Sequence, residues 1–100
     1  METTIQEVDG KLVATLSGEF DTAAAIDAEQ ALKPLLESPG RDLAIDCSEL
    51  EYISSSGLRI FLNILKNARS SGNKVTLLGV NEVIRDVLEL TGLVKLFELE

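Results

Sequence analysis

Three consecutive serines and a glycine, Ser54-Ser55-Ser56-Gly57, are the residues whose types and spacing most suggest a chemical role. They stand where an apolar segment gives way to an amphipathic one, so we expect their hydroxyls at the mouth of a helix. A serine there can cap the helix by accepting hydrogen bonds from free N–H groups. It can instead present its hydroxyl to another molecule. Capping explains one or two serines but not three, so both interpretations stay open.

A phosphoryl group is a modification that a serine at a helix start would tolerate. It would place about −1.5 to −2 charges beside the helix N-terminus, where negative charge is mildly stabilised. A partner packed on the same residues would have to bury an unpaired charge, at a cost of several kcal/mol. The stretch is therefore suited to an electrostatic switch that turns binding off and leaves the fold unchanged.

The sequence contains no histidine and a single cysteine, Cys47. Nucleophiles activated by histidine and the usual zinc ligand sets are therefore excluded. The phosphate-binding patterns GxGxxG and GxxxxGK[ST] are also absent. An enzyme is disfavoured, and we expect no catalytic residue, metal or other cofactor. A lone cysteine cannot form an internal disulfide and fits a reducing compartment, and we expect Cys47 in the core.

The net charge of −8 argues against binding nucleic acid or an anionic membrane through a basic surface. Hydrophobic residues make up 45% of the chain, enough for one core, yet no apolar run approaches the ~20 residues that span a membrane. The first residues lack the basic region and cleavage site of a signal peptide. We therefore predict a cytoplasmic domain spanning residues 1–100, monomeric when free and without membrane insertion.

Short sequence patterns predict the strands that must position the serines. Asp9-Gly10 predicts a hairpin between two opening strands, and the second strand alternates apolar and polar residues up to Gly18. Residues 42–48 predict a strand buried on both faces, ending near Asp46. Further strands are predicted over residues 74–79 and near the end of the chain.

Three helices are predicted between these strands. The first covers residues 23–38, is capped by Asp21 or Thr22, and can be kinked by Pro34, with Pro39-Gly40 closing its loop. The second covers 56–72 and the third 81–92, which Asn81 caps. The apolar positions expected to face inward are Ala24, Ala28, Ala31, Leu32, Leu35, Leu58, Phe61, Leu62, Leu65, Ala68, Val83, Ile84, Val87, Leu88 and Leu90.

Strands and helices alternate after the hairpin, which predicts an α/β fold with right-handed parallel crossovers and an antiparallel edge. The sheet is therefore mixed, with helices packed on it. The serines fall in a loop at the C-terminal edge of a strand, where open α/β sheets place functional sites.

These features together resemble the STAS domain, and specifically the free-standing bacterial anti-sigma factor antagonists (anti-anti-sigma factors). The resemblance covers nearly the whole chain. It rests on Gly18-Glu19-Phe20-Asp21, on Asp46-Cys47-Ser48, on Tyr52-Ile53-Ser54-Ser55-Ser56-Gly57-Leu58, and on the closing helix and strand around Leu93 to Phe97. The third group is fairly specific and the others support it.

The resemblance implies a phosphorylation switch. In such proteins the serine before the glycine is phosphorylated by an anti-sigma factor that is also a serine kinase of the histidine-kinase-like ATPase type. The unphosphorylated antagonist binds this kinase and frees the sigma factor, and a PP2C-type phosphatase restores the active form. Carried onto this sequence, the phosphorylated residue is Ser56, with Ser55 as second choice. Ser54 stands where many members have aspartate.

The partner-binding surface is predicted to extend beyond the serines. Asp21 is similar to an aspartate that helps engage the kinase in the family, and it can also cap a helix. Asp46 is expected to satisfy free N–H groups of the residues after it. Helical spacing adds Arg59, Ile60 and Asn63, and exposed Ile26 and Ile64 would extend an apolar surface. The predicted contacts are Asp21, Ser54, Ser55, Ser56, Gly57, Arg59, Ile60 and Asn63.

A second function remains open from the sequence. The resemblance also fits a non-phosphorylated STAS adaptor subunit of a stressosome or of a lipid or anion transporter complex. The hydroxyl discriminates between the two, because the switch requires Ser56 or Ser55 and the adaptor tolerates alanine at both positions.

Overall fold

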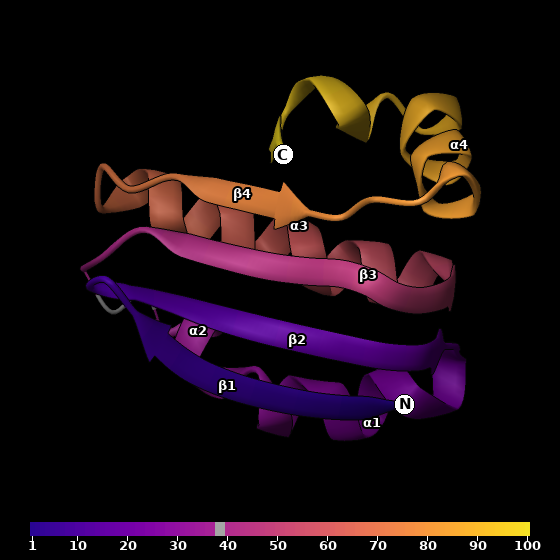
Figure 1. The fold of residues 1–100 in the computed structure, drawn as a ribbon, viewed down its shortest axis with the longest axis horizontal. Coiled ribbons are helices and arrows are strands. Elements are labelled where there is room, and N and C mark those ends of the chain that lie inside the picture. Colours follow the sequence, from indigo (N-terminus) through magenta and orange to yellow (C-terminus); the bar gives the residue numbers. More distant parts are fainter. Residues whose placement is uncertain (38–39) are drawn as a thin grey trace.

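Five strands lie side by side in chain order in one sheet (Figure 1). The strands are β1 (Glu2–Val8), β2 (Lys11–Phe20), β3 (Leu43–Ile53), β4 (Val75–Leu78) and β5 (Glu98–Leu99). β1 pairs antiparallel with β2, and the other neighbours pair in parallel. The computed structural model describes residues 1–37 and 40–100. The predicted mixed α/β fold is confirmed.

The helices are α1 (Thr22–Ala31), α2 (Lys33–Leu36), α3 (Ser55–Ser70) and α4 (Glu82–Leu90), followed by a 3₁₀ turn, η1 (Leu93–Lys95). Figure 1 shows α1, α2 and α3 behind the sheet on one face, whereas α4 lies beyond the end of β4. α3 contacts β3 and β4 as well as α1 and α2. It therefore sits in the middle of the covered face, and its first residues are the serines.

The opening hairpin forms where the sequence predicts it. Asp9 and Gly10 have φ angles of 51° and 81°, both in the left-handed region. A two-residue hairpin turn with two positive φ angles matches the right-handed twist of the strands, and Asp-Gly is a favoured sequence for it. The hairpin fixes the register of β1 on β2, from Glu2 opposite Ser17 to Val8 opposite Lys11.

The first helix is shorter than predicted. The chain leaves helical geometry at Leu32 and starts again as α2, in which Pro34 occupies the second position. Proline lacks the N–H that a helix interior requires, but an N–H in the first turn has no helical partner. The break therefore replaces the expected kink. Pro39, part of the predicted loop closure Pro39-Gly40, lies outside the described residues.

Most predicted inward positions are buried, but three are wrong. Ala31, Val83 and Leu90 are exposed, and Leu90 is 88% exposed. α4 lies at the margin of the sheet and buries only a narrow stripe containing Ile84 and Leu88. Ala31 is the last residue of α1, just before the break at Leu32.

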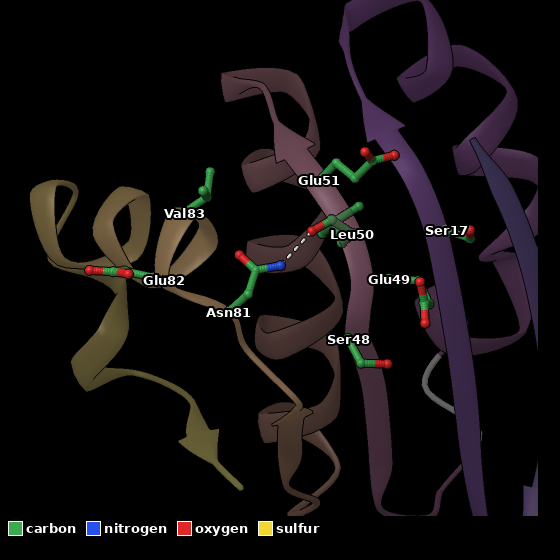
Figure 2. A pocket seen from close by; sticks show the side chains of 8 residues that line it. All are labelled: Ser17, Ser48, Glu49, Leu50, Glu51, Asn81, Glu82 and Val83. Carbon is green, nitrogen blue, oxygen red and sulfur yellow. Dashed lines mark hydrogen bonds between the residues drawn. The ribbon is translucent and has the colours of Figure 1, made fainter.

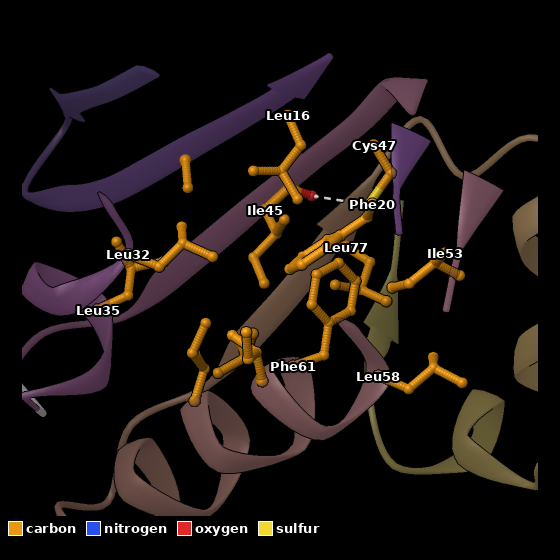
Figure 3. Close-up of a cluster of buried hydrophobic side chains, with 14 of the residues drawn as sticks. Leu16, Phe20, Leu32, Leu35, Ile45, Cys47, Ile53, Leu58, Phe61 and Leu77 are labelled. Carbon is orange, nitrogen blue, oxygen red and sulfur yellow. Dashed lines mark hydrogen bonds between the residues drawn. The ribbon is translucent and has the colours of Figure 1, made fainter. Parts of the chain in front are cut away.

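The core lies between the sheet and the helices on its covered face (Figure 3). Phe61 of α3 is fully buried and meets two rings edge-on. Its ring centroid is 6.0 Å from that of Phe20 and 6.3 Å from that of Phe97. Phe61 therefore joins α3 to the end of β2 and to the C-terminal segment, and it fixes where α3 begins.

β3 is longer than predicted, because it continues past Asp46 to Ile53. Its pairing with β2 shifts register twice, from Thr15–Asp46 to Ser17–Glu49 and again between Gly18 and Glu19. These bulges break the strict alternation, so that Leu50 is buried although Ser48 and Glu49 before it are exposed. The serines thus follow a strand directly and do not lie in a long loop.

Candidate functional site

Ser54 is the cap of α3. Its Oγ accepts a hydrogen bond from the backbone N–H of Gly57 at 3.2 Å, and its own N–H donates to the carbonyl oxygen of Phe20 at 2.8 Å. The residue is 7% exposed. The capping interpretation therefore holds for this serine, which shapes the site through the backbone and offers a partner almost no side-chain surface.

Ser55 and Ser56 occupy the first two positions of α3 and differ from Ser54. Ser55 is exposed and Ser56 is half-buried. Neither hydroxyl has a hydrogen-bond partner among residues 1–37 and 40–100. The site therefore consists of one committed hydroxyl and two free ones, which capping alone does not explain.

Gly57 allows the first turn of α3 to lie close to the strands. A Cβ at this position would be 2.9 Å from Cγ1 of Ile53 and 3.0 Å from two ring atoms of Phe20. Both neighbours are buried and cannot move aside easily. The absence of a side chain at Gly57 thus allows the start of α3, with its serines, to pack closely against the ends of the strands. Gly57 itself is buried.

Asp21 lies at the start of α1 and caps it. Its Oδ1 accepts a hydrogen bond from the N–H of Ala24 at 2.7 Å, which settles the choice between Asp21 and Thr22 as cap. The backbone bond between Ser54 and Phe20, the residue before Asp21, ties the starts of α1 and α3 together. The structure therefore brings Asp21 and the serines to one corner of the molecule, as the sequence predicts.

A hollow of about 250 Å³ opens beside Ser56 between α1 and α3. Its lining residues are Thr22, Ala25, Ile26, Glu29, Ser56 and Arg59. Ile26 is 75% exposed, an unusual position for a large aliphatic side chain. Arg59 and Asn63 are exposed on α3. These residues give the corner a mixed apolar and polar surface.

The prediction that Ile60 contacts a partner is wrong, because its side chain is 3% exposed. Ile64 is fully buried as well. α3 packs against the sheet, α1 and α2 at the same time, so its wide apolar arc is covered on three sides. Of the isoleucines considered from the sequence, only Ile26 extends the surface.

Asp46 and Cys47 have structural roles. Oδ1 of Asp46 accepts from the N–H of Ser48 at 3.0 Å and from its hydroxyl at 2.7 Å, so the expected pairing with the following residues is confirmed. Cys47 is fully buried, as expected for a core residue. Burial, aided by the nearby Asp46 carboxylate, raises the pKa of the Cys47 thiol to about 12.

Cys47 is therefore expected to resist alkylation in the folded protein. The thiolate is the reactive form, and a pKa of about 12 leaves roughly one thiol in ten thousand ionised at pH 8. Iodoacetamide should modify the native protein at a small fraction of the rate seen after unfolding in guanidinium. Equal rates in the native and unfolded protein would show that Cys47 is accessible.

Removal of the Ser54 hydroxyl, which caps α3, is expected to lower the stability of the protein measurably. Ser54→Ala should lower the free energy of unfolding by about 1 kcal/mol, because the N–H of Gly57 loses its acceptor. Ser55→Ala is the matched control and should change it by less than about 0.5 kcal/mol, since its hydroxyl is exposed. Urea denaturation of the two variants checks this, and equal stabilities would contradict the capping role.

A second hollow of about 590 Å³ was missed by sequence reasoning (Figure 2). It lies between the extended part of β3 and the start of α4, where Asn81 donates to the carbonyl oxygen of Leu50 at 2.7 Å. Three glutamates, Glu49, Glu51 and Glu82, line it, and neither Ser55 nor Ser56 does. In the part of the chain that the structure describes, no cluster of acidic, cysteine or histidine side chains is placed to hold a metal.

Within residues 1–37 and 40–100, no helix is both long and apolar enough to cross a membrane. The longest, α3, has 16 residues and exposes polar side chains such as Arg59 and Asn63.

Comparison with known proteins places the whole chain in one group. The sequence profile described as "STAS domain" matches residues 2–100. BtrV from Bordetella bronchiseptica is 32% identical over 97 residues, which are 97% of this chain and 84% of BtrV. The Anti-sigma-B factor antagonist of Staphylococcus aureus is 30% identical over 93% of this chain and 84% of its own length. The crystal structure of an anti-sigma factor antagonist from Mycobacterium paratuberculosis superposes with a TM-score of 0.81, at 33% identity, over 98% of this chain and 83% of that one.

Proposed function

The chain belongs to the STAS domain family, and from this premise we propose that it is an anti-sigma factor antagonist whose partner binding is switched off by phosphorylation of Ser56. Relatives matched over most of their length carry the name of anti-sigma factor antagonist. The observation that carries the switch is the free, half-buried hydroxyl of Ser56, which lines a hollow beside an exposed isoleucine. The protein is a regulatory binding partner and a substrate, and not an enzyme.

The phosphoryl transfer requires only a hydroxyl from this chain. Oγ of Ser56 attacks the γ-phosphorus of ATP, the bond to ADP breaks, and the hydroxyl proton passes to a base of the kinase. The kinase, of the histidine-kinase-like ATPase type, holds the nucleotide and its magnesium ion. A PP2C-type phosphatase then uses water to cleave the phosphate ester, which restores the hydroxyl and releases inorganic phosphate.

Ser56 is preferred over its neighbours for physical reasons. The hydroxyl of Ser54 is buried and committed to the cap. Ser55 has a free hydroxyl but does not line the hollow between α1 and α3, whereas Ser56 does. A phosphate on Ser56 would therefore lie within the surface that a partner covers. Ser55 remains the second choice.

The surface around the hollow supports docking of the anti-sigma factor. Ile26 supplies exposed apolar area, and Arg59, Asn63 and Asp21 supply polar and charged groups around it. A few well-placed apolar and arginine side chains carry most of the affinity in protein interfaces. We assign the partner contacts to Asp21, Ser55, Ser56, Arg59 and Asn63, together with Ile26.

A phosphate at this position would change binding far more than folding. It would sit at the helix N-terminus, where the partial positive charge of the free N–H groups favours it. The backbone there is held by the Ser54 cap and by the bond to Phe20, so no rearrangement is needed. A partner that covers Ser56 would have to bury the same charge, which is strongly unfavourable.

The test is capture of partners with matched bait proteins. Ser56→Ala and Ser56→Asp variants are immobilised and exposed to lysate of the native organism, and bound proteins are identified by mass spectrometry. We expect the alanine bait to retain an ATP-binding serine kinase and the aspartate bait to lose it. Recovery of the same proteins on both baits would reject the switch and favour the constitutive adaptor.

A further inference from the structure

Arg59 stands apart from the other arginines of the chain. It is exposed, and its guanidinium has no hydrogen bond or ion pair among residues 1–37 and 40–100. The other three arginines all have partners. The pairs are Arg41 with Glu7, Arg69 with the carbonyl oxygen of Leu96, and Arg85 with Glu89. A long cationic side chain without a partner is available for a group that the unmodified chain lacks.

Arg59 is also placed next to Ser56. The two residues are three positions apart on α3, a spacing that brings side chains to the same side of a helix, about 5–6 Å apart at Cβ. Both line the hollow between α1 and α3. A guanidinium binds phosphate oxygens with two parallel N–H bonds, and such charge-assisted bonds are stronger than neutral ones.

We propose that Arg59 is the counter-charge of a phosphoryl group on Ser56, so that phosphorylation also withdraws its guanidinium from the docking surface. This inference rests on the proposed function and adds a second component to it. The phosphate introduces negative charge, and the same event removes a cation that the unphosphorylated surface offers to the partner.

Two carboxylates near the hollow could compete with the phosphoryl group for the guanidinium of Arg59. Glu29 of α1 lines the same hollow but forms no ion pair with Arg59 within 4.0 Å. Asp21 at the start of α1 is the other carboxylate at this corner, and its Oδ1 is bonded to the N–H of Ala24. A phosphoryl group carries up to two charges and lies on the same helix as Arg59, so it competes well with either carboxylate.

The experiment is a phosphorus NMR titration of the protein with phosphoserine incorporated biosynthetically at position 56. No kinase or partner is needed. The second pKa of the phosphoryl group, near 6 in free phosphoserine, should be higher in Arg59→Gln than in the wild type by about 0.4. The dianion loses its counter-charge in the variant, and the helix N-terminus is the same in both proteins.

Three further variants serve as controls for the Arg59→Gln measurement. Lys66→Gln removes a positive charge that lies about 15 Å along the helix from Ser56, and it should leave the pKa of the phosphoryl group unchanged. Arg59→Lys should give a pKa between those of the wild type and Arg59→Gln, because lysine keeps the positive charge but cannot form the bidentate hydrogen bonds of a guanidinium. Glu29→Gln should shift the pKa in the opposite direction, to a lower value.

Equal pKa values in the wild type and in Arg59→Gln would overturn the inference. So would an equal shift in Lys66→Gln, since that would indicate a general charge effect. Neither result touches the proposed function, which fails separately if the captured kinase does not phosphorylate Ser56.

Discussion

Aspartate at position 56 is expected to weaken binding to the anti-sigma factor by about 100-fold or more, equivalent to about 2.7 kcal/mol. The carboxylate would be buried beneath the partner beside Ile26 and Glu29, and among the described residues that line the hollow only Arg59 carries a compensating positive charge. Ser56→Ala should retain affinity within a few fold, because the hydroxyl has no hydrogen-bond partner among the residues that the structure describes. Calorimetric titration of both variants against the captured partner gives the two affinities.

A matched control separates the position from the charge. Ser70→Asp places the same carboxylate on the same helix at its other end, where the residue is exposed. This variant should bind as the wild type does. Similar losses in Ser56→Asp and Ser70→Asp would show that added negative charge anywhere on this acidic chain weakens binding, and the assignment of the docking surface would be wrong.

Truncation of Phe61 is expected to have the largest effect on folding. Phe61→Ala should lower the free energy of unfolding by about 3–5 kcal/mol, because it leaves a cavity between the rings of Phe20 and Phe97. A domain of this size has a total stability of about 5–15 kcal/mol, so the variant would be close to unfolding. Urea denaturation followed by circular dichroism measures the change.

Phe61→Leu keeps the measurement possible if the alanine variant does not fold. It removes less volume and should cost less, about 1–2 kcal/mol. Asn63→Ala is exposed on the same helix and should change the stability by less than about 0.5 kcal/mol. A loss below about 1 kcal/mol in Phe61→Ala would contradict the role of this ring as the anchor of α3.

Local signals made much of the fold predictable. Asp9-Gly10 specified the hairpin, and Asp21 and Asn81 cap the helices that follow them. Gly72 and Gly92 follow helices in the left-handed conformation, where a residue without Cβ is favoured. Each of these features depends on a few adjacent residues, so the sequence alone is sufficient to indicate them.

Features set by contacts between distant segments were not predictable in the same way. β3 runs to Ile53 because it stays paired with β2 through two register shifts, which hide its apolar pattern. Ile60 is buried because α1 and α2 pack beside α3, and no helical wheel of α3 contains that information. The hollow beside Ser56 likewise depends on how α1 meets α3.

The candidate site depends both on local sequence signals and on contacts between distant segments. The three serines and Gly57 marked the start of a helix, but the sequence left open which serine was the cap. The hydrogen bond that the N–H of Gly57 donates to Oγ of Ser54 assigns that role, and the hydroxyls of Ser55 and Ser56 stay free among the described residues. The exposed Ile26 and the unpaired Arg59 then distinguish the surroundings of Ser56 from those of Ser55.

The most direct test follows the purified complex of this protein with its captured kinase after addition of magnesium and ATP. Size-exclusion chromatography reports the fraction still bound, and mass spectrometry locates the phosphate. We predict that the wild-type complex dissociates with phosphate on Ser56, while the Ser56→Ala complex persists under the same conditions. Dissociation of both complexes, or persistence of the wild-type complex after Ser56 is fully phosphorylated, would contradict the account.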